Sequence, residues 1–130
     1  MKTRIDNKPL VYSCSGCSSA AQMANYIVVQ LDRMDVAEMS CIAGVGGNVK
    51  SLVRTATSGR KIIAIDGCPL ACSKACLSNH LVKPNIHLDL SSMGVSKKLH
   101  EDFDIDNANQ ILKRIEMLIH KISVNHPCVI

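Results

Sequence analysis

The sequence feature that most restricts the fold is the continuous apolar run Ile62-Ile63-Ala64-Ile65. A strand with one face in water alternates apolar and polar residues, whereas this run has no polar position. Strands of this kind are covered on both faces, which is typical of a parallel sheet with helices on each side. The run therefore predicts a buried strand over residues 61–65, at the centre of such a sheet.

Three other short apolar runs predict strands near residues 10–13, 37–41 and 85–90, the last alternating like an edge strand. Helical spacing of apolar residues lies between and after them, at residues 20–31, 48–57 and 108–122, with a shorter helix from Pro69. Strands that alternate with helices predict right-handed crossovers. We expect one domain over residues 1–130: an α/β three-layer sandwich with a mainly parallel four-stranded sheet, flavodoxin-like or Rossmann-like.

Residue preferences at helix ends predict where several helices begin. Ser18 or Ser19 suits the N-cap of the first helix, and proline is favoured at the first helical position, as at Pro69. Asn107 and Gln110 have the spacing of a capping box for the last helix.

The chain has seven cysteines, and four of them follow predicted strands: Cys14, Cys17, Cys41 and Cys68. The carboxyl ends of parallel strands share one edge of the sheet, where open α/β proteins bind ligands. The segment Cys68-Pro-Leu-Ala-Cys72-Ser-Lys-Ala-Cys76 adds two more thiols at helical spacing. The sequence therefore predicts a cluster of thiols at the carboxyl edge of the sheet.

Clustered thiols in a chain without a secretion signal suggest a soft metal or redox chemistry. A helix N-terminus stabilises thiolate, the form that binds metal, and helices are expected directly after Cys17 and Cys68. Buried cysteine also serves as a small apolar residue, and that reading suits Cys76 and Cys128. Zinc and iron–sulfur sites both use four thiolates, so the ligand type does not separate them.

The residues also carry a family resemblance. Cys14-Ser-Gly16, Cys41-Ile-Ala-Gly-Val-Gly46 and Asp66-Gly67-Cys68-Pro-Leu-Ala-Cys72, with Gly94-Val95, resemble the DGC-domain family of proposed zinc-binding proteins, from about Leu10 to Val95. The resemblance implies four chelating cysteines, Cys14, Cys41, Cys68 and Cys72, with zinc as the cofactor. It supplies no reaction, so whether the chain is an enzyme stays open.

Cys17 and Cys76 exceed that set and are candidates for an additional ligand or a reactive thiol. They leave open an alternative function: an iron–sulfur protein, or a thiol-based redox or sulfur-transfer protein. Around the ligands we expect Gly16 and Gly67 to donate backbone hydrogen bonds and Asp66 to orient a helix start or a group near the metal. His80 and His87 lack a close Cys or His partner in sequence, so we expect surface or hydrogen-bonded histidines.

Composition and charge indicate in which compartment the protein lies and which classes of partner are not expected. No signal peptide or membrane-length apolar stretch is visible, which predicts a cytoplasmic protein with no membrane partner. The net charge of +4 is mild and aromatic residues make up 2% of the chain, so a nucleic-acid platform is not expected. The glycines at 44, 46 and 47 match no nucleotide-binding motif and predict a tight turn near the cysteines.

Overall fold

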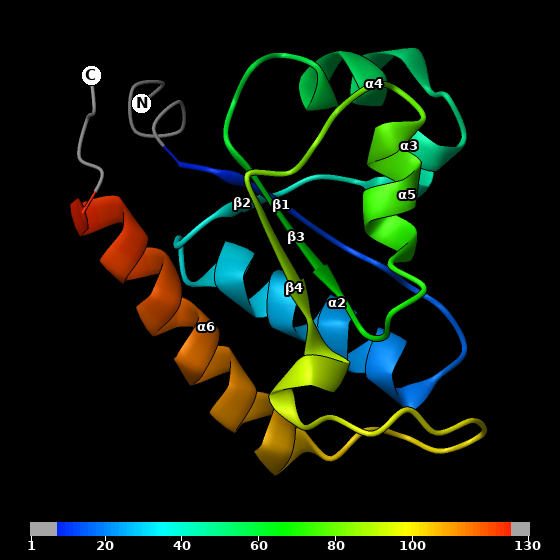
Figure 1. Cartoon of the computed structure of the whole chain (residues 1–130), viewed down its shortest axis with the longest axis vertical. Coiled ribbons are helices and arrows are strands. Elements are labelled where there is room, and N and C mark those ends of the chain that lie inside the picture. Colours follow the sequence, from blue (N-terminus) through cyan, green and yellow to red (C-terminus); the bar gives the residue numbers. More distant parts are fainter. Residues whose placement is uncertain (1–7, 126–130) are drawn as a thin grey trace.

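The computed structural model describes residues 8–125 and contains a parallel sheet at its centre (Figure 1). The four strands are β1 (Leu10–Ser13), β2 (Glu38–Met39), β3 (Ile62–Asp66) and β4 (Ile86–Asp89), in the order β2-β1-β3-β4. All three pairings are parallel, and β3 lies between β1 and β4. The predicted fold class is confirmed, including the edge position of the last strand.

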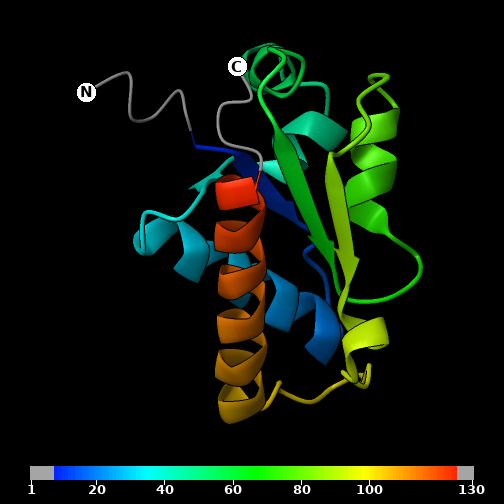
Figure 2. The same cartoon turned by 60° about the vertical axis from the view of Figure 1, so that its left-hand side comes forward.

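Helices cover both faces of the sheet, as the two views in Figures 1 and 2 show. One face carries α2 (Ser19–Arg33) and α6 (Ile105–Asn125), which pack against each other. The other carries α3 (Ile42–Gly46), α4 (Lys50–Ala56) and α5 (Cys72–Ser78). A short 3₁₀ helix, η1 (Leu90–Met93), follows β4. Within residues 8–125, no helix is long and apolar enough to cross a membrane.

The two faces of the sheet form two separate apolar clusters. Side chains alternate along a strand, so Val11, Ile63 and Ile65 pack towards α2 and α6. Leu10, Tyr12, Ile62 and Ala64 belong to the second cluster, with Val45 and Leu77. The buried strand predicted from the continuous apolar run is therefore confirmed: β3 is buried at all its positions.

The sheet order places a topological switch point between β1 and β3. The chain leaves β1 towards β2 on one side and returns to β3 on the other. At such a point, neighbouring crossovers lie on opposite faces and a crevice opens beyond the strand ends. The segments beyond these strand ends are the ones that contain Cys14 and Gly67-Cys68.

Several helix boundaries differ from the sequence-based expectation. Ser18 caps α2 as predicted, accepting from the Ala21 N–H at 3.1 Å. By contrast, Asp104 rather than an Asn107–Gln110 box caps α6, because its Oδ1 accepts from the Asp106 N–H at 3.0 Å. The helix α3 was not predicted at all, since glycine has a low helix propensity. Gly44 is needed there, because a Cβ atom would lie 1.9 Å from Leu52 Cδ1 on α4.

The end of α5 contains a leucine in a left-handed conformation. The Val82 N–H donates to Leu77 O and the Leu81 N–H to Ser78 O, which is the Schellman pattern. Leu81 occupies the position usually given to glycine, with φ of 62°, and its side chain is 97% exposed. The leucine side chain therefore adds backbone strain with no packing in return.

We predict that Leu81→Gly stabilises the protein by about 0.5–1 kcal/mol, because glycine adopts this conformation without a steric cost. Urea unfolding of the two proteins measures the difference. Leu70→Gly is the matched control, since Leu70 is also exposed and does not have a positive φ. An equal or larger gain from the control substitution would contradict the explanation.

Candidate functional site

The centre of the candidate site is Cys14, which lies just past β1 and is 8% exposed. Its own N–H donates to Ile65 O on β3 at 3.2 Å, and its Sγ accepts from the Gly67 N–H at 3.2 Å. Gly67 is tightly enclosed: a Cβ atom there would lie 2.6 Å from the backbone C and O of Ala20 on α2. Glycine is therefore required for the loop after β3 to reach Cys14. This confirms the expected hydrogen bond from Gly67.

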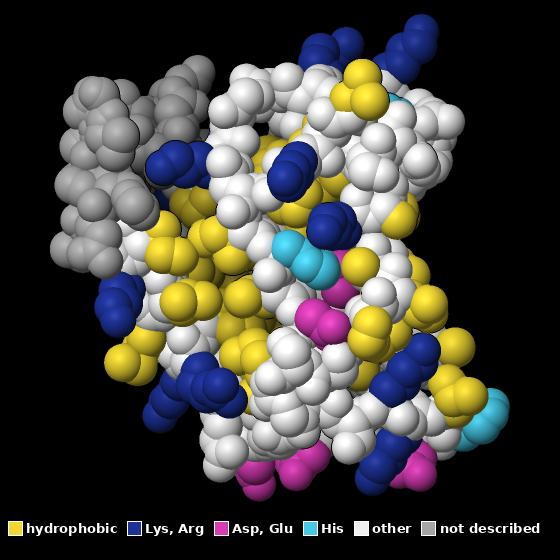
Figure 3. Space-filling model, viewed as in Figure 1, with side chains coloured by type: hydrophobic (Ala, Val, Ile, Leu, Met, Phe, Trp, Pro, Cys, Tyr) yellow, Lys and Arg dark blue, Asp and Glu magenta, His cyan; other side chains and the backbone are white. Residues whose placement is uncertain are grey.

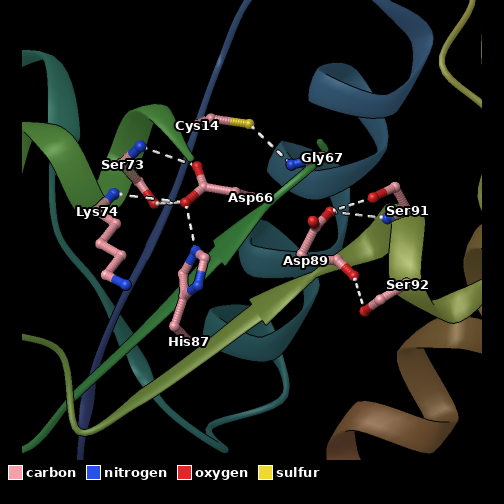
Figure 4. A network of polar contacts seen from close by, with 9 residues as sticks. All are labelled: Cys14, Asp66, Gly67, Ser73, Lys74, His87, Asp89, Ser91 and Ser92. Carbon is pink, nitrogen blue, oxygen red and sulfur yellow. Dashed lines mark hydrogen bonds and ion pairs between the residues drawn. The ribbon is translucent and has the colours of Figure 1, made fainter. Parts of the chain in front are cut away.

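Asp66, the last residue of β3, has a fully buried carboxylate (Figure 4). Its Oδ1 accepts from the Ser73 N–H at 2.8 Å, and its Oδ2 accepts from Ser73 Oγ at 2.8 Å and from the Lys74 N–H at 3.4 Å. A buried charge is tolerated only when hydrogen bonds replace its water. The expectation that Asp66 orients a helix start is therefore confirmed, since it binds the first turn of α5.

This bond pattern corrects the predicted start of the helix after β3. The helix begins at Cys72 and not at Pro69, because Ala71 has a left-handed conformation with φ of 52°. The N–H groups of Ser73 and Lys74 in the first turn bind Asp66, and the helix begins three residues further from Cys68 than expected. Cys72 and Cys76 therefore lie on α5, while Cys68 lies in the preceding turn.

His87 on β4 completes the buried network from the neighbouring strand. Its Nε2 lies 2.8 Å from Asp66 Oδ2, and its side chain is 23% exposed. The pair becomes an ion pair when the imidazole is protonated. Because β4 runs beside β3, alternate residues of both strands face the same side, and His87 lies diagonally across from Asp66. The expectation of a hydrogen-bonded histidine is confirmed, but its partner could not be read from local spacing.

Burial raises the pKa of the Cys14 thiol to about 11, which keeps the group protonated at neutral pH. The hydrogen bond from Gly67 lowers this pKa, and the nearby charge of Asp66 raises it. Cys14 therefore accepts a hydrogen bond from the loop after β3 and lies within electrostatic reach of the buried carboxylate.

Two thiols on α5 interact with this centre. Cys72 is exposed at the start of α5 and interacts electrostatically with both Cys14 and Cys76. Cys76 is partly buried against the second apolar cluster, and burial raises its pKa. A Cβ atom on Gly46 would lie 3.0 Å from Cys76 Sγ, so α3 approaches α5 closely at this glycine. The structure thus brings Cys14, Cys72 and Cys76 into one neighbourhood.

The other cysteines have separate surroundings. Cys41 is exposed and caps α3, with its Sγ accepting from the Gly44 N–H at 3.4 Å. Cys68 is half-buried, and Lys97 Nζ lies 3.5 Å from its Sγ. Cys17 is exposed in the loop before α2. Cys128 lies outside the described residues.

No three His, Cys, Asp or Glu side chains in residues 8–125 are grouped closely enough to hold a metal ion. Cysteine thiolates are suitable ligands for a soft metal, but in the structure these thiols are not close enough together to form a metal site. Gly16, expected beside the ligands, uses its carbonyl to accept from Gln22 Nε2 at 2.5 Å.

Sequence reasoning missed Ser73 and Lys97. Ser73 is fully buried and donates twice to Asp66, although serine within a helix usually indicates a solvent position. Lys97 reaches Cys68 from a loop 29 residues later, and no local pattern predicts such a contact. Only the strand order could have suggested that residues after β4 lie near the end of β3.

We predict that Asp66→Asn destabilises the protein by about 2–4 kcal/mol, because it puts amide donors among buried donors and removes a buried charge partner. Asp89→Asn is the matched control. Asp89 is the register partner of Asp66 on β4, is only half-buried and caps η1 by accepting from the Ser91 N–H at 2.9 Å (Figure 4). Asparagine keeps an oxygen that can accept this bond and caps helices about as well as aspartate, so the control should cost only roughly a few tenths of a kcal/mol. Equal losses in chemical denaturation would show that burial of Asp66 has no special role.

A second prediction concerns pH in the metal-free, reduced protein. The pKa of Cys14 is raised in the folded state. Its contribution to the free energy of unfolding is therefore complete below about pH 9 and is lost as pH rises towards about 11. Over that range the free energy of unfolding should fall by about 2–3 kcal/mol more in the parent protein than in Cys14→Ala. Denaturant titrations at several pH values measure this, and parallel curves for the two proteins would contradict it.

The comparisons with known proteins agree with the motifs at this edge of the sheet. Residues 10–115 match the family model of the DGC domain. The chain is 54% identical over 114 residues to the anaerobic and virulence modulator AnvM of Pseudomonas aeruginosa strain PAO1, which covers 88% of this chain and 87% of that protein. No solved structure matches. The match spans the sheet, the cysteine loops and the first half of α6, and the chain belongs to the DGC-domain family.

Proposed function

We propose that the chain binds a soft metal ion, with zinc as the first candidate, through the thiolates of Cys14, Cys41, Cys68 and Cys72. We also propose that it modulates another process and is not a purely structural protein. The modulating role rests on the relative named an anaerobic and virulence modulator. An oxygen-dependent process would suit a protein with clustered thiols, because thiols and thiolate-bound metals respond to oxidants.

The observation that best supports metal binding is the position of the cysteines relative to the switch point. Cys14 and Cys68 follow the two strands that flank it, and Cys72 begins the helix after the second strand. Ligands of open parallel sheets bind at this edge. Thiolate is the ligand that zinc and copper(I) prefer in proteins, and zinc takes four such ligands in closed sites.

The same site requires movement before it can hold an ion. Cys41 and Cys68 have separate partners, Gly44 and Lys97, and neither is buried. Their contacts are long hydrogen bonds to sulfur at 3.4 and 3.5 Å, which are weak enough to exchange for a metal bond. Lys97 and Lys74, near Cys68 and Asp66, would offset part of the negative charge of four thiolates around a divalent ion.

A second candidate function is thiol-based redox or sulfur chemistry, with an iron–sulfur cluster as a further form. It is favoured by the interaction of Cys72 with both Cys14 and Cys76, and by the exposure of Cys17. Oxidation of two neighbouring thiols to a disulfide releases two electrons and two protons to an oxidant. A coloured protein after anaerobic purification, or a disulfide with no bound metal, would support this function instead.

Metal analysis tests the first proposal. Protein purified anaerobically without added metal should carry about one zinc per chain. Cys68→Ser should lose the metal and the thermal stability that binding adds, whereas Cys128→Ser, a thiol outside the described residues, should lose neither. Absence of metal in the parent protein, or loss only in Cys128→Ser, would overturn the assignment.

Alkylation tests the separate role of Cys17. We predict that Cys17→Ala keeps its metal but loses the fastest reaction with iodoacetamide at neutral pH, because Cys17 is exposed and unbound, whereas the exposed Cys41 and Cys72 would be bound to the proposed metal. Mass spectrometry of partly labelled protein identifies the site. Loss of metal in Cys17→Ala would make Cys17 a ligand, and unchanged fast labelling would assign the reactive thiol elsewhere.

A further inference from the structure

A groove at the opposite end of the molecule from the cysteine edge has a different chemistry. It has a volume of about 470 Å³ and is lined by Asn48, Lys50, Val53, Arg54 and His80. The groove lies between α4 and the end of α5, whereas β3 and β4 point towards the other end (Figure 1). Pockets of this size hold small molecules. The proposed metal site does not account for this groove.

The charge around the groove is strongly one-sided. From Met39 to Leu88, the chain contains one acidic residue, the buried Asp66, and six basic residues: Lys50, Arg54, Arg60, Lys61, Lys74 and Lys83. In Figure 3, the end of the molecule that carries α4 shows Lys and Arg side chains at its top, with no Asp or Glu near them. Arg60 is paired with Glu38 at 2.8 Å, and the remaining basic side chains give this end a field that attracts anions.

The basic side chains of the groove lack acidic partners. Lys50 and Arg54 are one turn apart on α4, so they share one face of the helix and repel each other. In the described part of the chain, neither forms an ion pair. An anion bound between them would remove this repulsion and supply the missing partner.

His80 is the third polar group, and the fold holds it in place. Its Nε2 lies 2.9 Å from Val45 O at the end of α3, and since a carbonyl only accepts, Nε2 is the nitrogen that donates. Nδ1 is then the ring nitrogen available to a ligand: it accepts a hydrogen bond in the neutral ring and donates one only when the imidazole is protonated. Val53 adds an apolar wall beside these groups. The groove therefore combines a guanidinium, an ammonium and an imidazole with one apolar surface.

We propose that this groove binds a small phosphate monoester. A planar guanidinium binds two phosphate oxygens at once, and an ammonium can contact the third. The imidazole contacts that oxygen by donating from Nδ1 when the ring is protonated, or by accepting from the P–O–H group of a monoanion when it is neutral. The apolar wall at Val53 suits the organic part of an ester, which free phosphate lacks. The glycines before α4 do not form a phosphate cradle, because Gly44 and Gly46 are occupied by packing against Leu52 and Cys76. Side chains provide the recognition.

Titration of the full chain with phenyl phosphate and with inorganic phosphate, at constant ionic strength, tests the proposal. In ¹H–¹⁵N spectra, both should give saturable shifts at the amides of Asn48, Lys50, Arg54 and His80, with phenyl phosphate binding more tightly. Equal affinities would assign the groove to free phosphate and overturn the monoester. Shifts that do not saturate, or that centre on the cysteine loops, would overturn the proposal that the groove is the binding site.

Matched variants separate recognition from general charge. Arg54→Gln should weaken binding of phenyl phosphate about tenfold, the loss expected for one charge-assisted hydrogen bond. Lys113→Gln removes the same charge from the exposed face of α6 and should leave the affinity unchanged. Equal weakening in both variants would overturn the proposal. Arg54→Lys keeps the charge and should also weaken binding, because it loses the two-point contact.

Discussion

The buried carboxylate of Asp66 is the interaction on which the cysteine edge depends. It accepts from Ser73 and Lys74 on α5, contacts His87 on β4, and interacts electrostatically with Cys14 after β1. These groups come from three separate segments, and the carboxylate has lost all contact with solvent. Because a buried charge is costly without its partners, each segment is held in place by the others. The position of Cys72 at the start of α5 follows from this one group.

The family motif Asp66-Gly67-Cys68 therefore has a physical meaning at each position. Asp66 fixes the start of α5, Gly67 allows the loop to pass Ala20 and bind Cys14, and Cys68 follows at the exit. Thiols at such an exit can bind a metal or react with oxidants, which is consistent with a protein family that contains an anaerobic and virulence modulator. The basic groove beyond α4 lies at the other end of the sheet, so a ligand bound there would leave the cysteines free.

The architecture could be predicted because it depends on the spacing of apolar residues and on the order of the elements. Continuous apolar runs predicted strands, apolar stripes predicted helices, and their alternation predicted a parallel sheet. That Cys14 and Cys72 lie near each other could be expected, because both come soon after the carboxyl ends of neighbouring strands. The sequence could not locate the start of α5. Pro69 indicated a start there, but Ala71 has a left-handed conformation, and Asp66, six residues before Cys72, binds the first turn of the helix. Nor could it find His87 or Lys97, because both reach the site from later segments whose position depends on the strand order. The helix α3 was hidden by its glycines, of which Gly44 is required by packing against α4 and Gly46 packs against α5.

The central claim is that cysteines from separate strand ends form one thiolate site. X-ray absorption at the zinc edge of zinc-loaded, reduced protein tests it most directly, because it counts the sulfur atoms bound to the ion. The account predicts four sulfur neighbours at about 2.3 Å, falling to three in Cys14→Ser. A shell of nitrogen and oxygen atoms at about 2.0–2.1 Å, or a sulfur count unchanged in Cys14→Ser, would contradict it.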